Sequence, residues 1–146
     1  MIYLDTSYLV RLYYDDPGAD KVRELAASDN IACAAHGKAE MIAAFHRKLR
    51  DGAISQASYS ALLGQVRVHD KAGAFQWLSA GNETYLKIAE IYARLPATTF
   101  LRAADALHLA TASQNGFRQV YSNDAHLLDA ATHFGIEGKN PIGRQV

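Results

Sequence analysis

The sequence has a single cysteine, Cys33, which lies in the apolar run 31–35. One cysteine can form neither an internal disulfide nor a cysteine-based metal site, and a lone cysteine in an apolar run is typical of a small core residue. The sequence also lacks any apolar run approaching the roughly 20 residues that cross a bilayer, and the N-terminus lacks the features of a signal peptide. We therefore expect a cytoplasmic protein without membrane segments.

An excess of either charge is missing as well, because fifteen basic and fifteen acidic residues give a formal net charge of +0. Nucleic-acid-binding proteins usually carry a basic surface, so this balance weakens the case for such a partner. Four acids neutralised by a metal would leave the remaining surface net basic by about four charges. The segment 46–50 (His-Arg-Lys-Leu-Arg) is locally basic, although a solvated helix face is the simpler explanation for it.

Apolar segments that suit buried strands alternate with amphipathic segments that suit helices, over one domain of residues 1–146. Strands are predicted at 2–4, 31–35, 74–78 and 117–122, with an edge strand around Ile136. Helices are predicted at 8–14, 16–28 (Asp16 as cap, Pro17 at the first helical position), 38–50, 55–68 (Ser55 as cap), 82–95 (Asn82 as cap), 102–114 and 124–134. Strands separated by helices indicate right-handed crossovers, and therefore an α/β fold with a mainly parallel sheet flanked by helices on both faces.

Four acidic residues stand at the edges of apolar segments, where carboxylates are locally out of place. Asp5 and Asp124 each follow a predicted strand, whereas Glu40 and Asp105 lie near the starts of predicted helices, where the helix dipole favours acids modestly. In open α/β sheets the carboxyl ends of the strands face helix N-termini, and ligands bind in the crevice between them. We expect all four acids to meet there.

Carboxylates that lie together repel one another, and a divalent cation removes that conflict. A set made only of carboxylates suits Mg²⁺ or Mn²⁺ better than zinc. Such a centre supports phosphodiester hydrolysis, because the ion lowers the pKa of a bound water and stabilises the charge that develops on the phosphate.

Each acid also has a purely structural explanation. Asp5 and Asp124 are compatible with helix caps, Glu40 with a first-turn acid, and Asp105 with an ion pair to Arg102. Four independent caps need not occur at the same edge of one sheet, which favours the shared site.

Histidines offer further candidates for the site. His108 follows Asp105 on the same helical face and suits a ligand or general base, although a partly buried histidine packed beside the site is the interpretation that we favour. His126 suits either the groove or an exposed first turn, and the remaining histidines, including His36, form no zinc motif.

Four segments resemble the signatures of the PIN domain family, in order and at suitable spacing: the N-terminal Ile-Tyr-Leu-Asp-Thr-Ser, Ala39-Glu40, Ala104-Asp105-Ala-Leu-His-Leu-Ala110, and Ser122-Asn123-Asp124. The similarity spans nearly the whole chain, and the length resembles VapC-like toxins. The resemblance implies a PIN-like three-layer α/β/α sandwich and a Mg²⁺- or Mn²⁺-dependent endoribonuclease that is inhibited by a cognate VapB-like antitoxin and is usually a homodimer.

By this resemblance, catalytic and metal-binding roles carry over to Asp5, Glu40, Asp105 and Asp124. Ser7 and Ser122 correspond to small hydroxyl residues that orient the acidic centre, with Thr6, Asn123 and His108 beside them. We expect Asp5, Asp105 and Asp124 to hold one or two ions, Glu40 to complete the site directly or through water, and water to attack single-stranded or looped RNA.

Two other functions fit part of this pattern. A haloacid-dehalogenase-type phosphatase needs an aspartate two residues after the first, where this chain has Ser7. A non-catalytic PIN-like module that binds RNA or protein is the more serious alternative, and the complete acidic set argues against it.

Overall fold

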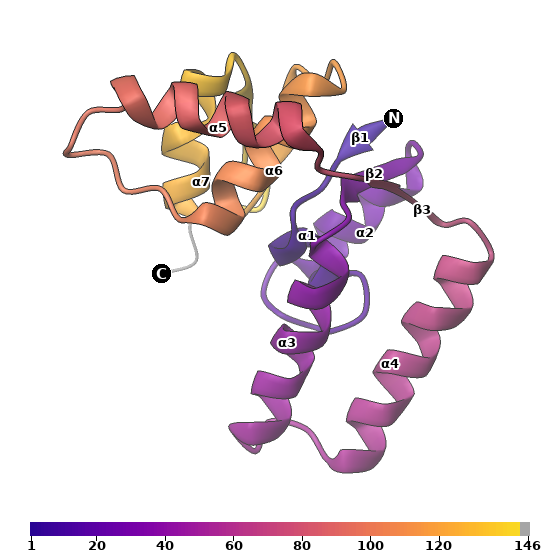
Figure 1. The fold of residues 1–146 in the computed structure, drawn as a ribbon. Helices are drawn as coiled ribbons and strands as arrows, with labels where there is room; N and C mark the ends of the chain where they lie inside the picture. Colours follow the sequence, from indigo (N-terminus) through magenta and orange to yellow (C-terminus); the bar gives the residue numbers. More distant parts are fainter. Residues whose placement is uncertain (144–146) are drawn as a thin grey trace.

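The computed structural model describes residues 1–143. Its strands are β1 (Ile2–Tyr3), β2 (Ile31–Ala34), β3 (Phe75–Leu78), β4 (Gln119–Tyr121) and β5 (Glu137–Lys139). Its helices are α1 (Thr6–Arg11), α2 (Ala19–Ala27), α3 (Gly37–Arg50), α4 (Gln56–Lys71), α5 (Asn82–Arg94), α6 (Ala103–Gln114) and α7 (Ala125–Ala130), and a 3₁₀ helix, η1 (Ala131–Phe134), follows α7. Two helices follow each of the strands β1, β2 and β3, and α7 with η1 follows β4 (Figure 1).

All pairings between the strands are parallel. β1 pairs with β2 and β2 with β3, while β4 pairs with β5. A parallel bridge between Leu4 and Tyr121 joins these two sheets, and the Asp5 N–H donates to the Tyr121 carbonyl over 3.0 Å. The resulting strand order is β3-β2-β1-β4-β5. Along the chain, β2 and β3 are added on one side of β1, whereas β4 and β5 are added on its other side.

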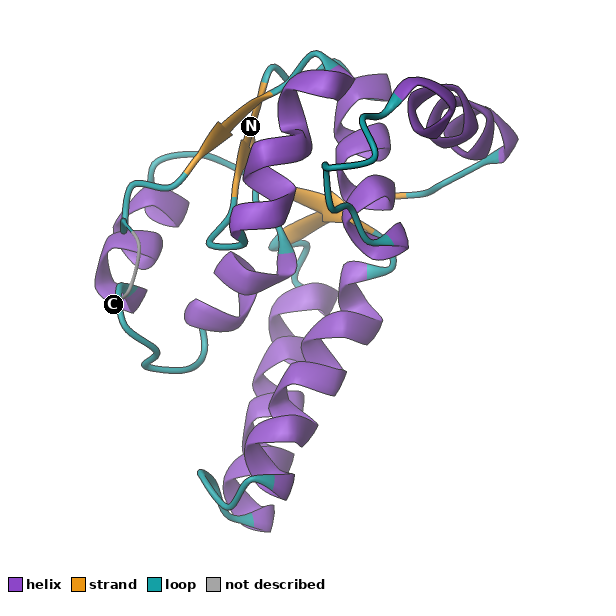
Figure 2. Ribbon diagram, turned by 90° about the vertical axis from the view of Figure 1, so that its left-hand side faces the viewer, coloured by secondary structure: helices purple, strands orange, loops and turns teal. Residues whose placement is uncertain are grey.

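The side chains of the strands alternate between two cores, as the period of two in a strand requires. Tyr3 and Ala32 join the core on one face, whereas Leu4 and Cys33 join the core on the other. Residues of α5, α6 and α7 complete the first core, and residues of α1, α2 and α3 complete the second. The predicted α/β fold with helices on both faces of a parallel sheet is therefore confirmed (Figures 1 and 2).

Helices α3 and α4 extend beyond the sheet as a hairpin (Figures 1 and 2). α4 has no fully buried residue, and it packs on α3 through partly buried side chains such as Tyr59 and Leu63. Ser55 caps α4 as predicted, since its Oγ accepts from the Ser58 N–H over 3.1 Å.

Two predicted helix caps were wrong. Asp16 accepts the Ala19 N–H in a turn through its carbonyl, and α2 begins only after Gly18, whose φ of +84° and close approach to Ile142 suit glycine. Asp16 instead pairs its carboxylate with Lys48 at 2.9 Å.

The second wrong cap is Asn82, which is the first residue of α5 rather than its cap. The preceding Gly81 donates its N–H to Thr84 Oγ1 over 3.0 Å. The predicted helix 124–134 is likewise not continuous, because its second half is the 3₁₀ helix η1, and the predicted helix 8–14 ends at Arg11.

Candidate active site

The four predicted acids come from four separate segments and line one open cavity of about 640 Å³. Asp5 follows β1 and Asp124 follows β4, and the strand order reverses between these two neighbours. Glu40 lies in the first turn of α3 and Asp105 in the first turn of α6. Ligands of open α/β sheets bind at such a switch point, beyond the carboxyl ends of the strands.

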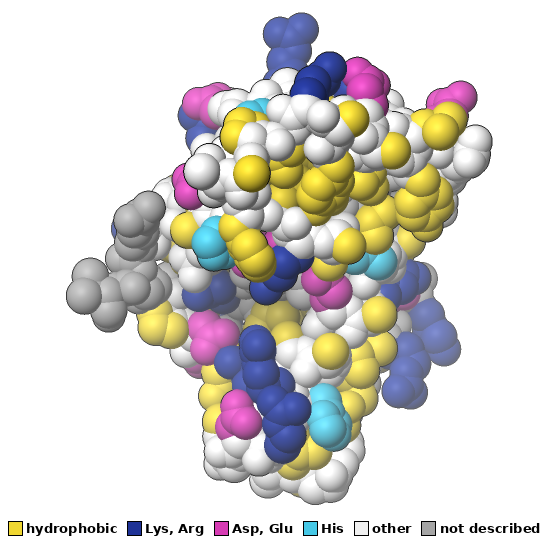
Figure 3. All heavy atoms as spheres, turned by 60° about the vertical axis from the view of Figure 1, so that its left-hand side comes forward, with side chains coloured by type: hydrophobic (Ala, Val, Ile, Leu, Met, Phe, Trp, Pro, Cys, Tyr) yellow, Lys and Arg dark blue, Asp and Glu magenta, His cyan; other side chains and the backbone are white. Residues whose placement is uncertain are grey.

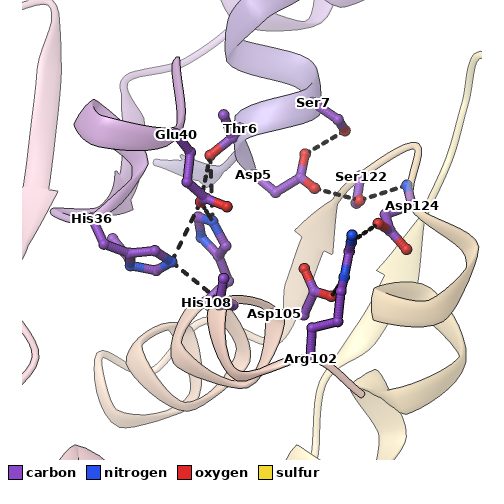
Figure 4. A network of polar contacts seen from close by, with 12 residues as sticks. Asp5, Thr6, Ser7, His36, Glu40, Arg102, Asp105, His108, Ser122 and Asp124 are labelled. Carbon is purple, nitrogen blue, oxygen red and sulfur yellow. Dashed lines mark hydrogen bonds and ion pairs between the residues drawn. The ribbon is translucent and has the colours of Figure 1, made fainter. Parts of the chain in front are cut away.

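Asp5 is the most constrained of these acids. Its Oδ1 accepts from the Ser7 hydroxyl over 2.6 Å and from the Tyr8 N–H, so it also caps α1, and its Oδ2 accepts from the Ser122 hydroxyl over 2.5 Å (Figure 4). Burial raises the pKa of Asp5 above its usual range, although the charge of His108 and the two serine hydroxyls oppose that rise. The site therefore holds a buried carboxylate under conditions that disfavour its charge.

The two serines also bind the chain that follows β4. Ser7 Oγ accepts the Asn123 N–H over 3.0 Å, and Ser122 Oγ accepts the Asp124 N–H over 2.9 Å. Each serine hydroxyl has a single proton, which it donates to Asp5. The bonds from the backbone N–H groups therefore fix the direction in which each hydroxyl points. Sequence reasoning had placed both serines beside the acids, and the structure brings them there.

Asp124 combines a cap with a position in the cavity. Its Oδ1 accepts the N–H groups of His126 and Leu127 at the start of α7, while its Oδ2 pairs with Arg102. Helix cap and site acid, which the sequence left as alternatives, are therefore compatible at this position.

Arg102 lies between two of the acids (Figure 4). Its Nε donates to Asp105 Oδ2 over 2.8 Å, and its Nη2 donates to Asp124 Oδ2. The hydrogen bond and charge of Asp105 raise the pKa of the guanidinium. The i−3 pair with Asp105 was an alternative visible in the sequence, whereas the contact with Asp124 was missed.

In this arrangement the acids face one another without closing to the spacing of metal ligands. Among the residues described, no three of the four bring one carboxylate oxygen each within 4.8 Å of one another. A cation bound by Asp105 and Asp124 would have to replace the charge that Arg102 supplies to them.

Glu40 is held by a chain of polar groups, of which His108 and Tyr3 are buried. Its Oε1 accepts from Thr6 Oγ1 over 2.9 Å and lies 2.6 Å from His108 Nε2. His108 is buried, and its Nδ1 lies 2.7 Å from the hydroxyl of Tyr3, which accepts the Ala34 N–H. Burial favours a raised pKa for Glu40, but the hydrogen bond and charge of His108 together with Thr6 outweigh it and lower that pKa.

His36 is a site residue that sequence reasoning missed. Its Nε2 lies 3.4 Å from Glu40 Oε1 and 3.1 Å from the Ala104 carbonyl, and its ring centroid is 4.2 Å from that of His108. Burial, with a contribution from His108, lowers the pKa of His36. The i,i+4 spacing from His36 to Glu40 is the signal in the sequence by which this contact could have been found. His126, by contrast, is exposed, and its ring packs against that of Phe100.

A basic wall borders the cavity on the α3 side, formed by Arg47, Lys48 and Arg50. Figure 3 shows Lys and Arg side chains gathered on the α3–α4 hairpin below the hollow. Lys48 is already engaged by Asp16 and lies over the Tyr14 ring, 3.9 Å from its centroid. Carboxylates at one side of a cavity and arginines at the other suit a cation and a polyanion respectively.

Fold and site together define an α/β protein with an acidic cavity at the switch point of its sheet. The PIN domain family model matches residues 2–132, so this chain belongs to the PIN domain family. The resemblance drawn from the sequence motifs is thereby confirmed. A search of curated proteins gave no match.

Solved structures share the fold at low sequence identity. FitAcB from Neisseria gonorrhoeae is 19% identical with a TM-score of 0.76, covering 97% of this chain and 98% of that one. VapC20 from Mycobacterium tuberculosis, described as a Sarcin-Ricin loop cleaving toxin, is 17% identical with a TM-score of 0.66, covering 89% and 95%. VapBC2 from Rickettsia felis, bound to a DNA fragment from its promoter, is 15% identical with a TM-score of 0.64, covering 96% and 98%.

Proposed function

We propose that this protein is a metal-dependent endoribonuclease that acts as the toxin of a toxin–antitoxin pair. The observation that carries the proposal is the convergence of Asp5, Glu40, Asp105 and Asp124 on one open cavity. Membership of the PIN domain family and the fold shared with VapC20, a toxin that cleaves the Sarcin-Ricin loop, support it.

The carboxylates supply hard oxygen donors, which fit Mg²⁺ or Mn²⁺. Asp5, Asp105 and Asp124 are the residues that would hold one or two ions, and Glu40 would complete the site directly or through water. When bound, such an ion lowers the pKa of a coordinated water and stabilises negative charge on the scissile phosphate.

The surrounding residues position these acids. Ser7 and Ser122 donate to the two oxygens of Asp5, the Asn123 N–H fixes Ser7, and Thr6 and His108 hold Glu40. Preorganised carboxylates need little rearrangement when charge develops on the phosphate, which is how such a frame contributes to rate.

On the substrate side, Arg47 and Arg50 are exposed cations at the rim of the cavity. They would contact the phosphates that flank the scissile bond, and unpaired RNA is the substrate class because its backbone reaches a recessed centre most easily.

An antitoxin that places a basic side chain among the acids would inhibit the enzyme, and Arg102 illustrates how well a guanidinium fits there. A VapB-like protein is the proposed partner, with a homodimer as the assembly and the cytoplasm as the location. No helix within residues 1–143 is long and apolar enough to cross a membrane.

The test is cleavage of a mixed pool of structured RNAs by purified protein in Mg²⁺, in Mn²⁺ and in chelator, beside Asp5→Asn. The matched control is Asp129→Asn, which changes an exposed aspartate of α7 that does not line the acidic cavity. We expect metal-dependent cutting by the wild type and the control, and none by Asp5→Asn.

Wild-type activity in Asp5→Asn would refute the assignment of the site. Failure of folded, antitoxin-free protein to cut any RNA in the pool would favour the non-catalytic PIN-like binding module.

A further inference from the structure

Two histidines and one carboxylate form a compact group at one end of the acidic cavity. One ring nitrogen of His36, one ring nitrogen of His108 and one oxygen of Glu40 all lie within 4.8 Å of one another. Within the described part of the chain, this is the one set of three such side chains that already has the spacing of metal ligands. Figure 4 shows Glu40 with both imidazoles on one side and Asp5 on the other.

The distances match those around a bound transition ion. Metal–ligand bonds of about 2.1 Å at tetrahedral or right angles separate neighbouring donor atoms by roughly 3.0–3.4 Å. Glu40 Oε1 is 3.4 Å from His36 Nε2 and 2.6 Å from His108 Nε2. Of these two distances, only the one to His108 must open, by a few tenths of an ångström.

Two of the three ligands, His108 and Glu40, already have an outer hydrogen-bond partner of the kind that orients metal ligands. His108 Nδ1 faces the Tyr3 hydroxyl at 2.7 Å, which orients the ring and directs Nε2 toward Glu40. The Thr6 hydroxyl holds the Glu40 carboxylate at 2.9 Å. His108 and Glu40 both line the open cavity, so an ion has a route from solvent to the group.

We propose that His36, His108 and Glu40 form a second metal site, which binds a transition ion such as Mn²⁺, Co²⁺ or Zn²⁺ in preference to Mg²⁺. Imidazole nitrogen suits these ions, whereas Mg²⁺ takes oxygen ligands and keeps several waters. Glu40 belongs to both sites and couples them. The inference does not depend on the proposed nuclease activity.

Binding requires defined changes at the two imidazoles. His36 Nε2 must give up its contact with the Ala104 carbonyl, and the proton between His108 and Glu40 must leave, so that both nitrogens present lone pairs to the ion. Protons are therefore released on binding, and the affinity for the ion falls as pH falls.

The experiment is a Co²⁺ titration of the full chain followed by visible absorption, which reports the coordination of the ion and requires no catalysis. It uses Asp5→Asn protein, so that the acidic cluster contributes less to Co²⁺ binding. His36→Gln is added to this background, and His46→Gln serves as the matched control, because His46 is an exposed histidine on the same helix α3 that lies outside the cavity.

We expect His36→Gln to weaken Co²⁺ binding by about tenfold or more and to change the spectrum, since even the outer partners of metal ligands change affinity by that amount. His46→Gln should leave both unchanged. His108→Gln should act like His36→Gln where circular dichroism shows that it folds.

Equal Co²⁺ affinity and spectra for Asp5→Asn with and without His36→Gln would overturn the site, as would a failure of Asp5→Asn protein to bind Co²⁺. The nuclease proposal is judged separately by Mg²⁺-dependent cleavage in wild-type protein. A negative result in the Co²⁺ titration therefore leaves the cleavage assay interpretable, and the reverse also holds.

Discussion

Arg102 is expected to compete with the proposed divalent cation for the acids of the cavity. Its guanidinium bridges Asp105 and Asp124, whose side chains are 8% and 25% exposed, while the Arg102 side chain is 55% exposed. Replacing it by glutamine keeps much of the length of the side chain and removes its charge. The prediction is that Arg102→Gln destabilises the metal-free protein and strengthens Mg²⁺ binding.

The size of the effect follows from the exposure of the three side chains. An exposed ion pair contributes about 0.2–1 kcal/mol, whereas removing one partner of a buried pair costs about 3–5 kcal/mol. Asp105 is buried but Arg102 is half exposed, so the expected loss in chelator is about 1–2 kcal/mol, or roughly 3–8 °C in Tm. If Mg²⁺ displaces Arg102, the same free energy tightens Mg²⁺ binding by a factor of about 5–30.

Thermal melts in chelator and across a Mg²⁺ series measure both quantities, with isothermal titration calorimetry for the affinity. The matched control is Arg94→Gln, whose partner Glu90 and own side chain are 60% and 62% exposed, far more than the acids that Arg102 binds. It should change neither quantity appreciably. A wild-type Tm for Arg102→Gln in chelator, or weaker Mg²⁺ binding, would show that Arg102 is not the counter-ion of the metal-free site.

Three further predictions concern stability. Because burial raises the folded-state pKa of Asp5 above 3.8, its contribution is favourable below that value and is lost as pH rises through the folded pKa. In chelator, wild type should therefore lose more stability than Asp5→Asn as pH rises from about 4 to neutral, and equal losses in urea melts would contradict this. Burial lowers the pKa of His36 below 6.5, so its contribution to stability is full above pH 6.5 and is lost as pH falls through the folded pKa. His36→Gln should therefore lose less stability than wild type between about pH 7 and pH 5. Parallel curves of stability against pH would exclude this. A Cβ on Gly37 would lie 2.7 Å from Cys33 Sγ, whereas one on Gly64 in α4 meets nothing within 4 Å. Gly37→Ala should therefore destabilise the protein by about 1–3 kcal/mol, and Gly64→Ala should stabilise it by about 0.5–1 kcal/mol. Urea melts that give both changes the same sign would refute the packing argument.

Much of the fold was predictable because burial leaves a local pattern in the sequence. The short apolar runs indicated the strands, and the alternation of strands with helices indicated a parallel sheet, both of which the structure contains. Asp5 and Asp124 were placed correctly at strand ends, since a parallel sheet brings these ends to one edge.

The helix boundaries were less predictable where a distant residue decides them. The start of α2 depends on the close approach of Gly18 to Ile142, and Asp16 turns away from its predicted cap toward Lys48. Neither contact leaves a signal in the neighbouring sequence.

The acids of the site were determined by the sequence alone, because their residue types and their places at strand and helix ends are local properties. The partners of those acids were decided only by the tertiary structure. Arg102 reaches Asp124 across 22 residues, His108 meets Tyr3 across 105, and His108 reaches Glu40 across 68. Such pairs depend on how helices pack against the sheet, and the periodicity of one segment holds no record of which side chains another segment will present.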